Sequence, residues 1–385
     1  MNRIVRVFLT TVFVTILLII PACSPASPRP VSTPVKSAPQ LPVPAASSPG
    51  QVSPQDAEWN KVIEAAKSEG SVVIYAGSDF GGPLRPAIIN SFQEKYGISV
   101  SMLVGRGQDA LQRVKVEKQI KRQVADMVQQ GGTSTSDFLE ADLADPMEKL
   151  LPELQINKDK FNYSPFYDPQ GRAVGATDLT LGPLINTNLV KPGDEPKSWF
   201  DIINPKWKGK ILLADPRRGG AGMSAFQTLQ FYKIVDESYF QKLLELDPGL
   251  WGGSSQEADN MVARGEYALG FNIAFELAMP LVTEGAPVKF LDMKEGQSVQ
   301  TGNIMLVKDR PHPNAARLLA NWLLSAEGQK IIHSSRGSKS IRKDVGDFTP
   351  EKGRIKITKP LLRDYNVTVT TNTYQEMANR LFGKK

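Results

Sequence analysis

The sequence has few of the residues that build disulfide-linked or metal-stabilised folds. Its 385 residues include one cysteine, Cys23, and two histidines, His312 and His333. One cysteine forms no internal disulfide and no zinc site made of several thiolates. Two histidines leave little material for a histidine-rich metal site. We therefore expect a fold that depends on its hydrophobic core, with no cofactor and no metal centre.

The sequence also lacks a concentrated block of one charge. Its 46 basic residues are nearly balanced by 40 acidic ones, which leaves a net charge of +6. Nucleic-acid binders usually gather their basic residues on one face or segment, so we expect no nucleic-acid partner. The apolar content of 41% excludes wholesale disorder. At roughly 150 residues per domain, the length predicts two domains.

The N-terminus has the pattern of a secretion signal. Two arginines precede an apolar run of 14 residues, Val7–Ile20. This run is short for a membrane span and typical of a signal-peptide core. It ends at Pro-Ala-Cys, which resembles a bacterial lipobox. In this interpretation residues 1–22 are a lipoprotein signal peptide, and Cys23 carries a diacylglycerol. An ordinary signal peptide cut nearby, or an uncleaved anchor, is the alternative.

A proline-rich segment follows Cys23. Ser24–Gln55 holds nine prolines in 32 residues, separated mainly by serine and alanine. Such a segment buries too little apolar surface to fold, so residues 23–55 are predicted to be a lipidated cysteine and an extended tether. A glycosylated stalk is the alternative. We expect the protein in the cell envelope, extracytoplasmic and lipid-anchored to the membrane.

Strand and helix patterns alternate after the tether. Buried strands are predicted at residues 72–76, 98–104, 125–129, 181–186, 210–214 and 267–272. Helices are predicted at residues 56–69, 84–95, 109–122, 223–233, 256–264 and 314–332. Alternation of this kind predicts parallel sheets with helices on both faces. A second unit begins near residue 176.

The loops after these strands supply the candidate binding residues. Ligands of open parallel sheets bind beyond the carboxyl ends of the strands. The candidates are Ser78, Arg106, Thr133, Ser134, Arg217, Arg218, Gly219, Gly222, Ser254 and Asn272. Plain turn residues are the alternative explanation for each of them taken singly.

Residues 215–222 are the strongest anion-binding candidate. A glycine-rich turn that opens a helix presents free backbone N–H groups and the positive end of the helix dipole. Arg217 and Arg218 lie in this turn and add positive charge. The Lys-Ser/Thr ending of a Walker loop is missing, so nucleotide hydrolysis is not supported. A surface loop with solvated arginines is the alternative.

No catalytic constellation is visible, and we do not expect an enzyme. His312 lies between two prolines and is predicted to be a turn residue. His333 follows the predicted helix at 314–332 and should contact its carbonyl end. Neither histidine has a visible serine or cysteine partner, and no His-Glu-x-x-His motif occurs.

Four phrases resemble the solute-binding components of bacterial ABC importers, most of all the group labelled ferric-iron type or family 1. They are GSVVIYAGS at 70–78, PKSWFDIINPKWKGK at 196–210, LADP at 213–216 and PHPNAARLLANWLLSAEGQ at 311–329. The resemblance implies a two-lobed α/β fold of the type II periplasmic-binding-protein kind. Each lobe would have a mostly parallel sheet with flanking helices, and the ligand cleft would lie between the lobes. The implied partners are a small-molecule ligand and a permease pair with its ATPase.

The resemblance also implies how the chain is divided. Lobe 1 would comprise residues 56–176 plus about 298–325, and lobe 2 residues 177–297 plus about 326–385. The chain would cross between the lobes near residues 177–179 and again near 299–303. We expect a monomer.

One departure from the family bears on the ligand. Iron-binding members carry adjacent tyrosines after the strand that corresponds here to residues 268–271, and this chain has Asn-Ile-Ala-Phe there. Our leading hypothesis is therefore a small anionic solute: an organic acid, a phosphonate or a phosphorylated metabolite. Ferric iron, a ligand-sensing role for a membrane receptor, and an enzyme on the same fold are the alternatives.

Overall fold

A computed structural model describes residues 54–162, 164–363 and 371–383. Residues 52–385 form one compact unit. The predicted signal peptide, Cys23 and almost all of the predicted tether lie outside the described residues. Within the described part of the chain, no helix has the length and apolar character needed to cross a membrane.

The strands form one continuous sheet. They are β1 (Ser71–Ala76), β2 (Ser99–Val104), β3 (Met127–Gly131), β4 (Ala144–Asp145), β5 (Val174–Asn186), β6 (Ile211–Ala214), β7 (Gly249–Trp251), β8 (Leu269–Ala274), β9 (Val288–Phe290), β10 (Gln297–Val307) and β11 (Pro360–Arg363). The main path of the sheet runs β2-β1-β3-β10-β5-β8-β6-β7. Strands β4 and β11 pair with β10, and β9 pairs with β5.

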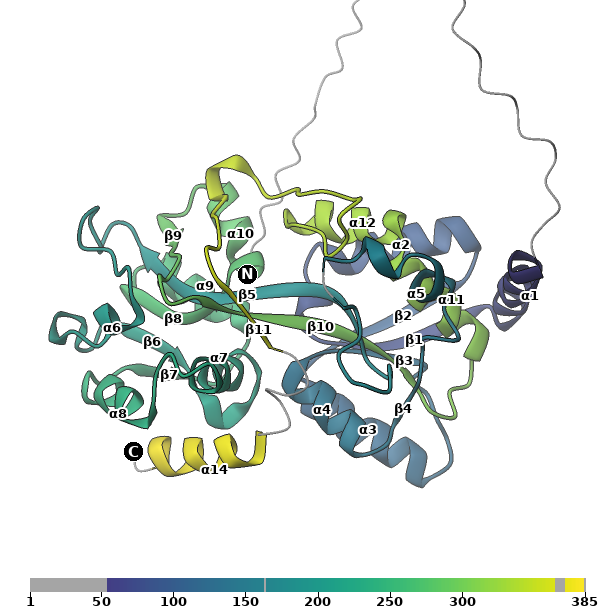
Figure 1. Cartoon of the computed structure of the whole chain (residues 1–385), viewed down its shortest axis with the longest axis horizontal. Coiled ribbons are helices and arrows are strands. Elements are labelled where there is room, and N and C mark those ends of the chain that lie inside the picture. Colours follow the sequence, from purple (N-terminus) through teal and green to yellow (C-terminus); the bar gives the residue numbers. More distant parts are fainter. Residues whose placement is uncertain (1–53, 163, 364–370, 384–385) are drawn as a thin grey trace, which may run out of the picture. The chain divides into compact units, whose positions relative to one another are not determined.

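The helices flank this sheet on both faces (Figure 1). They are α1 (Pro54–Glu69), α2 (Leu84–Tyr96), α3 (Gly107–Gln119), α4 (Gly132–Glu140), α5 (Pro152–Ile156), α6 (Trp199–Ile202), α7 (Gly220–Phe231), α8 (Glu237–Glu245), α9 (Ser255–Ala263), α10 (Phe275–Glu284), α11 (Pro313–Leu324), α12 (Ala326–Arg336) and α14 (Thr371–Phe382). Apart from the helix over 314–332, each predicted strand and helix is found in the predicted order. The ends differ by up to three residues, except that β5 begins seven residues earlier than predicted.

Two parallel groups of strands define two lobes. In lobe 1, β1 pairs in parallel with β2 and β3. In lobe 2, β6 pairs in parallel with β7 and β8. The long strands β5 and β10 run antiparallel to each other and connect the two groups (Figure 1). This arrangement confirms the predicted α/β class with a mostly parallel sheet in each lobe.

The two connecting strands pair along residues 174–181 and 298–304. Val299 pairs with Thr180, and Thr301 pairs with Asp178. The register between β5 and β10 shifts beside Gly302. A Cβ atom on Gly302 would collide with the carboxylate of Asp79. Glycine is therefore required at this point of the crossing, where the backbone approaches a buried acid.

Each lobe has its own hydrophobic core. Phe92 and Trp322 belong to the core of lobe 1, with their rings 5.5 Å apart. Trp199, Phe226 and Phe271 belong to the core of lobe 2. The strands predicted as apolar runs are buried between these cores and the flanking helices, as expected for parallel sheets.

The prediction of one long helix over 314–332 is wrong, because two helices occupy this stretch. Ser325 separates α11 from α12, has an extended conformation and accepts a hydrogen bond from the Gly328 amide at 3.2 Å. A serine cap of this kind starts a new helix. The apolar pattern continues across the break and therefore conceals it.

Packing also places two C-terminal segments. Ile332 of α12 lies in the core of lobe 1, whereas Phe382 of α14 packs in lobe 2, 6.0 Å from the ring of Phe226. Helix α12 thus packs in lobe 1, whereas the expected chain division assigns everything beyond about residue 325 to lobe 2.

Both histidines have structural roles in lobe 1. The Asp126 carboxylate accepts the His312 amide at 2.7 Å and faces its Nδ1 at 3.0 Å, while Nε2 lies 3.2 Å from the Ser71 hydroxyl. His312 thus fixes the start of α11 to the base of the sheet. His333 lies inside α12, not after the helix, and burial lowers its pKa to about 3.

Candidate functional site

A cavity of about 620 Å³ lies where the carboxyl ends of six strands meet. The loops after β1, β2 and β3 line it from lobe 1, and the loops after β6, β7 and β8 line it from lobe 2. Open parallel sheets bind ligands at this position. Residues of both lobes line the cavity, so a ligand bound there would contact both lobes.

The cavity collects nine of the ten predicted site residues. They are Ser78, Arg106, Thr133, Ser134, Arg218, Gly219, Gly222, Ser254 and Asn272. Arg217 is not among the lining residues. Residues more than 190 positions apart in the sequence are therefore brought to one site by the strand order.

Three helices begin at the cavity without a side-chain cap. They are α3, α4 and α7, whose N-caps are Arg106, Gly131 and Gly219. The first N–H groups of an α-helix have no partner within the helix. Together these three helices present unpaired donors and positive dipole ends to the cavity.

Two arginines from opposite lobes approach the same backbone position. Arg106 of lobe 1 reaches the carbonyl oxygen of Gly252 with Nη2 at 3.4 Å. Arg218 of lobe 2 lies against Gly252, because a Cβ atom there would sit 3.3 Å from its Nε. Within the residues that the structure describes, neither guanidinium has an acidic ion-pair partner. The charge of Arg218 contributes to lowering the pKa of Asp215, but the strongest partner of that carboxylate is Arg217. Two arginines that make no ion pair and meet at one backbone position are suited to binding an anion.

Arg217 has a different function from its neighbour. Its Nε and Nη2 atoms donate to the Asp215 carboxylate at 2.9 and 2.7 Å. Burial raises the pKa of Asp215, but these hydrogen bonds outweigh it, and the pKa is lower than usual. Asp215 also accepts the Arg217 amide at 3.0 Å, which closes the turn after β6. Arg217 thus neutralises a carboxylate at the cavity wall.

Asn272 and Ser254 hold the loops of lobe 2 in place. Asn272 donates to the Ala221 carbonyl at 3.0 Å and accepts the Ala214 amide at 3.2 Å. It therefore joins the end of β6 to the first turn of α7. Ser254 caps α9 by accepting the Glu257 amide at 3.3 Å.

The inner end of the cavity is polar and buried. Asp79 accepts hydrogen bonds from Gln129 at 2.6 Å and Thr177 at 3.0 Å. Burial raises the pKa of Asp79, and the positive charge of Arg336 partly opposes this shift. Gln300 accepts the Ser224 hydroxyl at 2.6 Å. These side chains offer acceptors and donors to the uncharged part of a ligand.

The cavity does not have the composition of a metal centre. Among the described residues, no group of three histidine, cysteine or acidic side chains could hold a metal ion. Tyr75 donates to the buried Glu117 at 2.6 Å and does not line the cavity.

Sequence reasoning missed several lining residues, including Asp79, Gln130, Ser224 and Gln300. Gln130 lies in β3 just beyond the predicted strand end, and Gln300 lies in the polar first half of β10. Both glutamines are buried in the structure, and the polar sequence around Gln300 gave no signal of this burial. Asp79 directly follows Ser78, but nothing in the sequence of this turn indicates that the Asp79 side chain lines the cavity.

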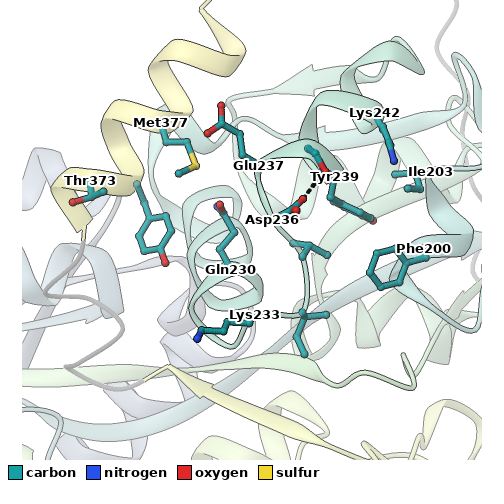
Figure 2. Close-up of a pocket in the computed structure, with 14 residues that line it drawn as sticks. Phe200, Ile203, Gln230, Lys233, Asp236, Glu237, Tyr239, Lys242, Thr373 and Met377 are labelled. Atoms are coloured by element: carbon teal, nitrogen blue, oxygen red, sulfur yellow. Dashed lines mark hydrogen bonds between the residues drawn. The ribbon is translucent and has the colours of Figure 1, made fainter.

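A second cavity of about 580 Å³ lies in lobe 2, between the α8 region and α14 (Figure 2). Phe200, Tyr239 and Met377 contribute to its wall. None of the predicted site residues lines it, and it has no contribution from lobe 1. The cavity at the strand ends is therefore the candidate site.

Fold and cavity together define a solute-binding protein. Residues 72–335 match the family model described as bacterial extracellular solute-binding protein. The chain therefore belongs to this family, the binding components of ABC importers. An uncharacterized protein of Haemophilus influenzae is 28% identical over 292 residues, which cover 73% of this chain and 80% of that protein.

Solved structures share the fold. Iron-bound HitA from Pseudomonas aeruginosa has a TM-score of 0.69 at 19% identity, covering 81% of this chain and 99% of that chain. The periplasmic binding protein AfuA from Actinobacillus pleuropneumoniae, with fructose-6-phosphate bound, has a TM-score of 0.66 at 22% identity, covering 82% and 97%. At these identities the likeness concerns the fold alone.

Proposed function

We propose that this solute-binding protein captures a small organic anion and delivers it to its importer. The observation that carries the proposal is the approach of Arg106 and Arg218, from opposite lobes, to Gly252 without a carboxylate partner. An anion bound between them would join the lobes through charge-assisted hydrogen bonds. Ligand binding would then favour the closed arrangement of the two lobes.

The size of the cavity favours an organic anion over a bare ion. About 620 Å³ is within the range of pockets for small organic molecules, roughly 300–1,000 Å³. A bare phosphate or metal ion would leave most of this space to water. The polar inner end, with Gln130 and Gln300, suits hydroxyl or amide groups of the ligand body. The fold shared with AfuA is consistent with a phosphorylated metabolite.

Ferric iron is the weaker alternative. It requires several hard anionic oxygen ligands. The cavity is lined by Asp79, Asp109 and Asp215, but they form no group that could hold a metal ion, and two arginines and three helix N-termini share the site. Because the chain shares its fold with iron-bound HitA, iron(III) is included in the binding test.

The test is a binding screen with the mature chain. Thermal shift and calorimetry would compare phosphonates, sugar phosphates, carboxylates and iron(III). We expect an organic anion to bind, and Arg106→Gln with Arg218→Gln to weaken binding by about a hundredfold or more. Arg264→Gln is the matched control, because Arg264 pairs with Glu266 on the surface and does not line the cavity. Iron binding that survives the double change would refute the proposal.

The cellular setting is part of the same proposal. The mature chain would be a monomer, lipidated at Cys23, tethered by the proline-rich segment and docked in its loaded form on a permease pair with an ATPase. It would act by binding and release, without turnover of the ligand. Metabolic labelling with a fatty acid, lost in Cys23→Ser, tests the anchor.

A further inference from the structure

The end of α3 and the turn that follows carry an exposed basic and apolar surface. We call it the α3 patch, and it consists of Lys115, Val116, Lys118, Ile120, Lys121, Arg122 and Val124. All seven residues are exposed. The three aliphatic side chains are 53%, 61% and 43% exposed and are spaced four residues apart. Val116 lies in α3, Ile120 is its C-cap and Val124 follows the helix. Large aliphatic side chains at this exposure are not core residues of this domain.

The four cations of the α3 patch have no ion-pair partners among the described residues. The charge of Lys118 helps to lower the pKa of Asp142, but that carboxylate is paired with Lys308 at 2.6 Å. Glu117 lies in the same stretch but is buried beneath it. It accepts hydrogen bonds from Tyr75, Val124 and Ala125. The surface of the patch therefore presents uncompensated positive charge around exposed aliphatic side chains.

We propose that the α3 patch docks the folded domain on an anionic phospholipid surface. Cations near such a surface are attracted to the headgroups, while exposed aliphatic side chains insert at the boundary with the acyl chains. The charge of the patch is complementary to anionic headgroups. Residues 24–53, 30 in number, join the predicted anchor at Cys23 to the first described residue and keep a membrane within reach.

The position of the α3 patch leaves the ligand site open. The first turn of α3 lines the cavity through Gly107 and Asp109. The patch lies toward the other end of the helix, roughly 15 Å away at 1.5 Å per residue. Both α3 and α1, where the described chain begins, belong to lobe 1 (Figure 1). Lobe 1 can therefore rest on the membrane without blocking the cleft.

The test is vesicle co-sedimentation of the unlipidated chain, residues 24–385, which contains the whole compact unit. We expect binding to vesicles of equal phosphatidylglycerol and phosphatidylcholine that declines with salt, and none to phosphatidylcholine alone. Lys121→Gln with Arg122→Gln should lower partitioning about 25-fold, because each cation near such a surface contributes about fivefold. Ile120→Ser should lower it several-fold.

Matched controls lie in lobe 2. Lys208→Gln with Lys210→Gln makes the same charge change at exposed positions, and Leu189→Ser removes an aliphatic side chain that is 54% exposed. These variants should bind vesicles like the parent chain. Equal losses in both sets would show general attraction of a basic protein and overturn the proposal. So would unchanged vesicle binding with impaired delivery to the importer, which would make the patch a protein-docking face.

A substitution at Lys121 can distinguish an effect on folding stability from an effect on vesicle binding. It has a left-handed backbone, with φ of 53°, at a helix end where glycine is favoured. Lys121→Gly should therefore raise the melting temperature and still weaken vesicle binding about fivefold. If vesicle binding instead rises with stability, the lysine does not contact the headgroups and the proposal is wrong.

Discussion

The two lobes line the same cavity with loops that are held in place differently. We call the loops after β1, β2 and β3 the edge of lobe 1, and those after β6, β7 and β8 the edge of lobe 2. In lobe 2, side chains bond to their own backbone: Asp215 to the Arg217 amide, Asn272 to Ala214 and Ala221, and Ser254 to the Glu257 amide. In lobe 1, the buried residues at the cavity are also bonded, because Gln129 accepts the Gly77 amide and Gln130 donates to the Tyr75 carbonyl, but Arg106 makes one long hydrogen bond, and it reaches across to lobe 2. The polar loop residues of lobe 2 are thus fixed in advance, and lobe 1 adds an arginine that can adjust to a ligand.

This difference has a consequence for mutations. A change in the edge of lobe 2 should disturb both folding and binding, because its polar groups shape the backbone that meets the ligand. A change at Arg106, in lobe 1, should affect binding and leave stability nearly unchanged. Ligand affinity measured together with unfolding free energy distinguishes these two outcomes.

The sharpest test of the comparison is a pair of glycine changes. A Cβ atom at Gly222, in lobe 2, would lie 2.6 Å from the Ala214 carbonyl oxygen, whereas Gly105, in lobe 1, has nothing within 4 Å. We expect Gly222→Ala to lower the unfolding free energy by about 3 kcal/mol and affinity more than a hundredfold, because α7 must move away from β6. Urea denaturation and calorimetry measure the two quantities.

Gly105→Ala is the control for this change. It adds the same methyl group at an exposed loop position and should alter neither quantity by more than about 0.5 kcal/mol. Equal effects of the two substitutions would mean that the lobe 2 edge is no more rigid than its counterpart.

The sequence predicts that the turn after β6 opens a helix, but it does not predict what each side chain in this turn binds. Arginines beside glycines at 217–222 correctly indicate a turn that opens a helix at the cavity. The sequence does not show that Asp215 binds Arg217 and leaves Arg218 free, because that depends on side-chain directions within one turn. Asn272 is likewise predicted as a ligand donor, while its amide holds α7 against β6.

Long-range placement explains the remaining differences. Asp79 becomes a buried acceptor because the crossing strand brings Thr177 to it, and no local pattern encodes this contact. The break at Ser325 has a local signal, a serine followed by glutamate and glycine, but the apolar periodicity on both sides masks it. Strand order and the family phrases were sufficient for the fold because both rely on regular elements.

The lobes also differ in their buried ionisable groups. His333 in lobe 1 is buried between Gln329 and Ser338, and its pKa is lowered to about 3. Asp259 in lobe 2 is buried, and its two carboxylate oxygens have no hydrogen-bond partner in the described structure. Burial raises the pKa of Asp259 well above its usual value. The two groups should respond to acid in opposite directions.

His333 should make the protein lose stability as the pH falls. An unfolded histidine takes up a proton below about pH 6.5, whereas the folded one stays neutral down to about pH 3. Between these values the unfolding free energy should fall by about 1.4 kcal/mol per pH unit. His333→Gln should flatten this part of the curve in urea denaturation. An unchanged slope in the variant would show that other groups cause the acid sensitivity.

Asp259 should act in the opposite direction with a smaller effect. The folded carboxyl keeps its proton above about pH 4, where the unfolded one releases it, so its contribution to stability falls as the pH rises. Asp259→Asn removes this penalty and should raise the unfolding free energy by about 1 kcal/mol at pH 7 and by nearly nothing at pH 4. Glu257→Gln, an exposed change on the same helix, is the control. If the Asp259 variant gains as much at pH 4 as at pH 7, the gain comes from packing, and the two groups do not respond to acid in opposite directions.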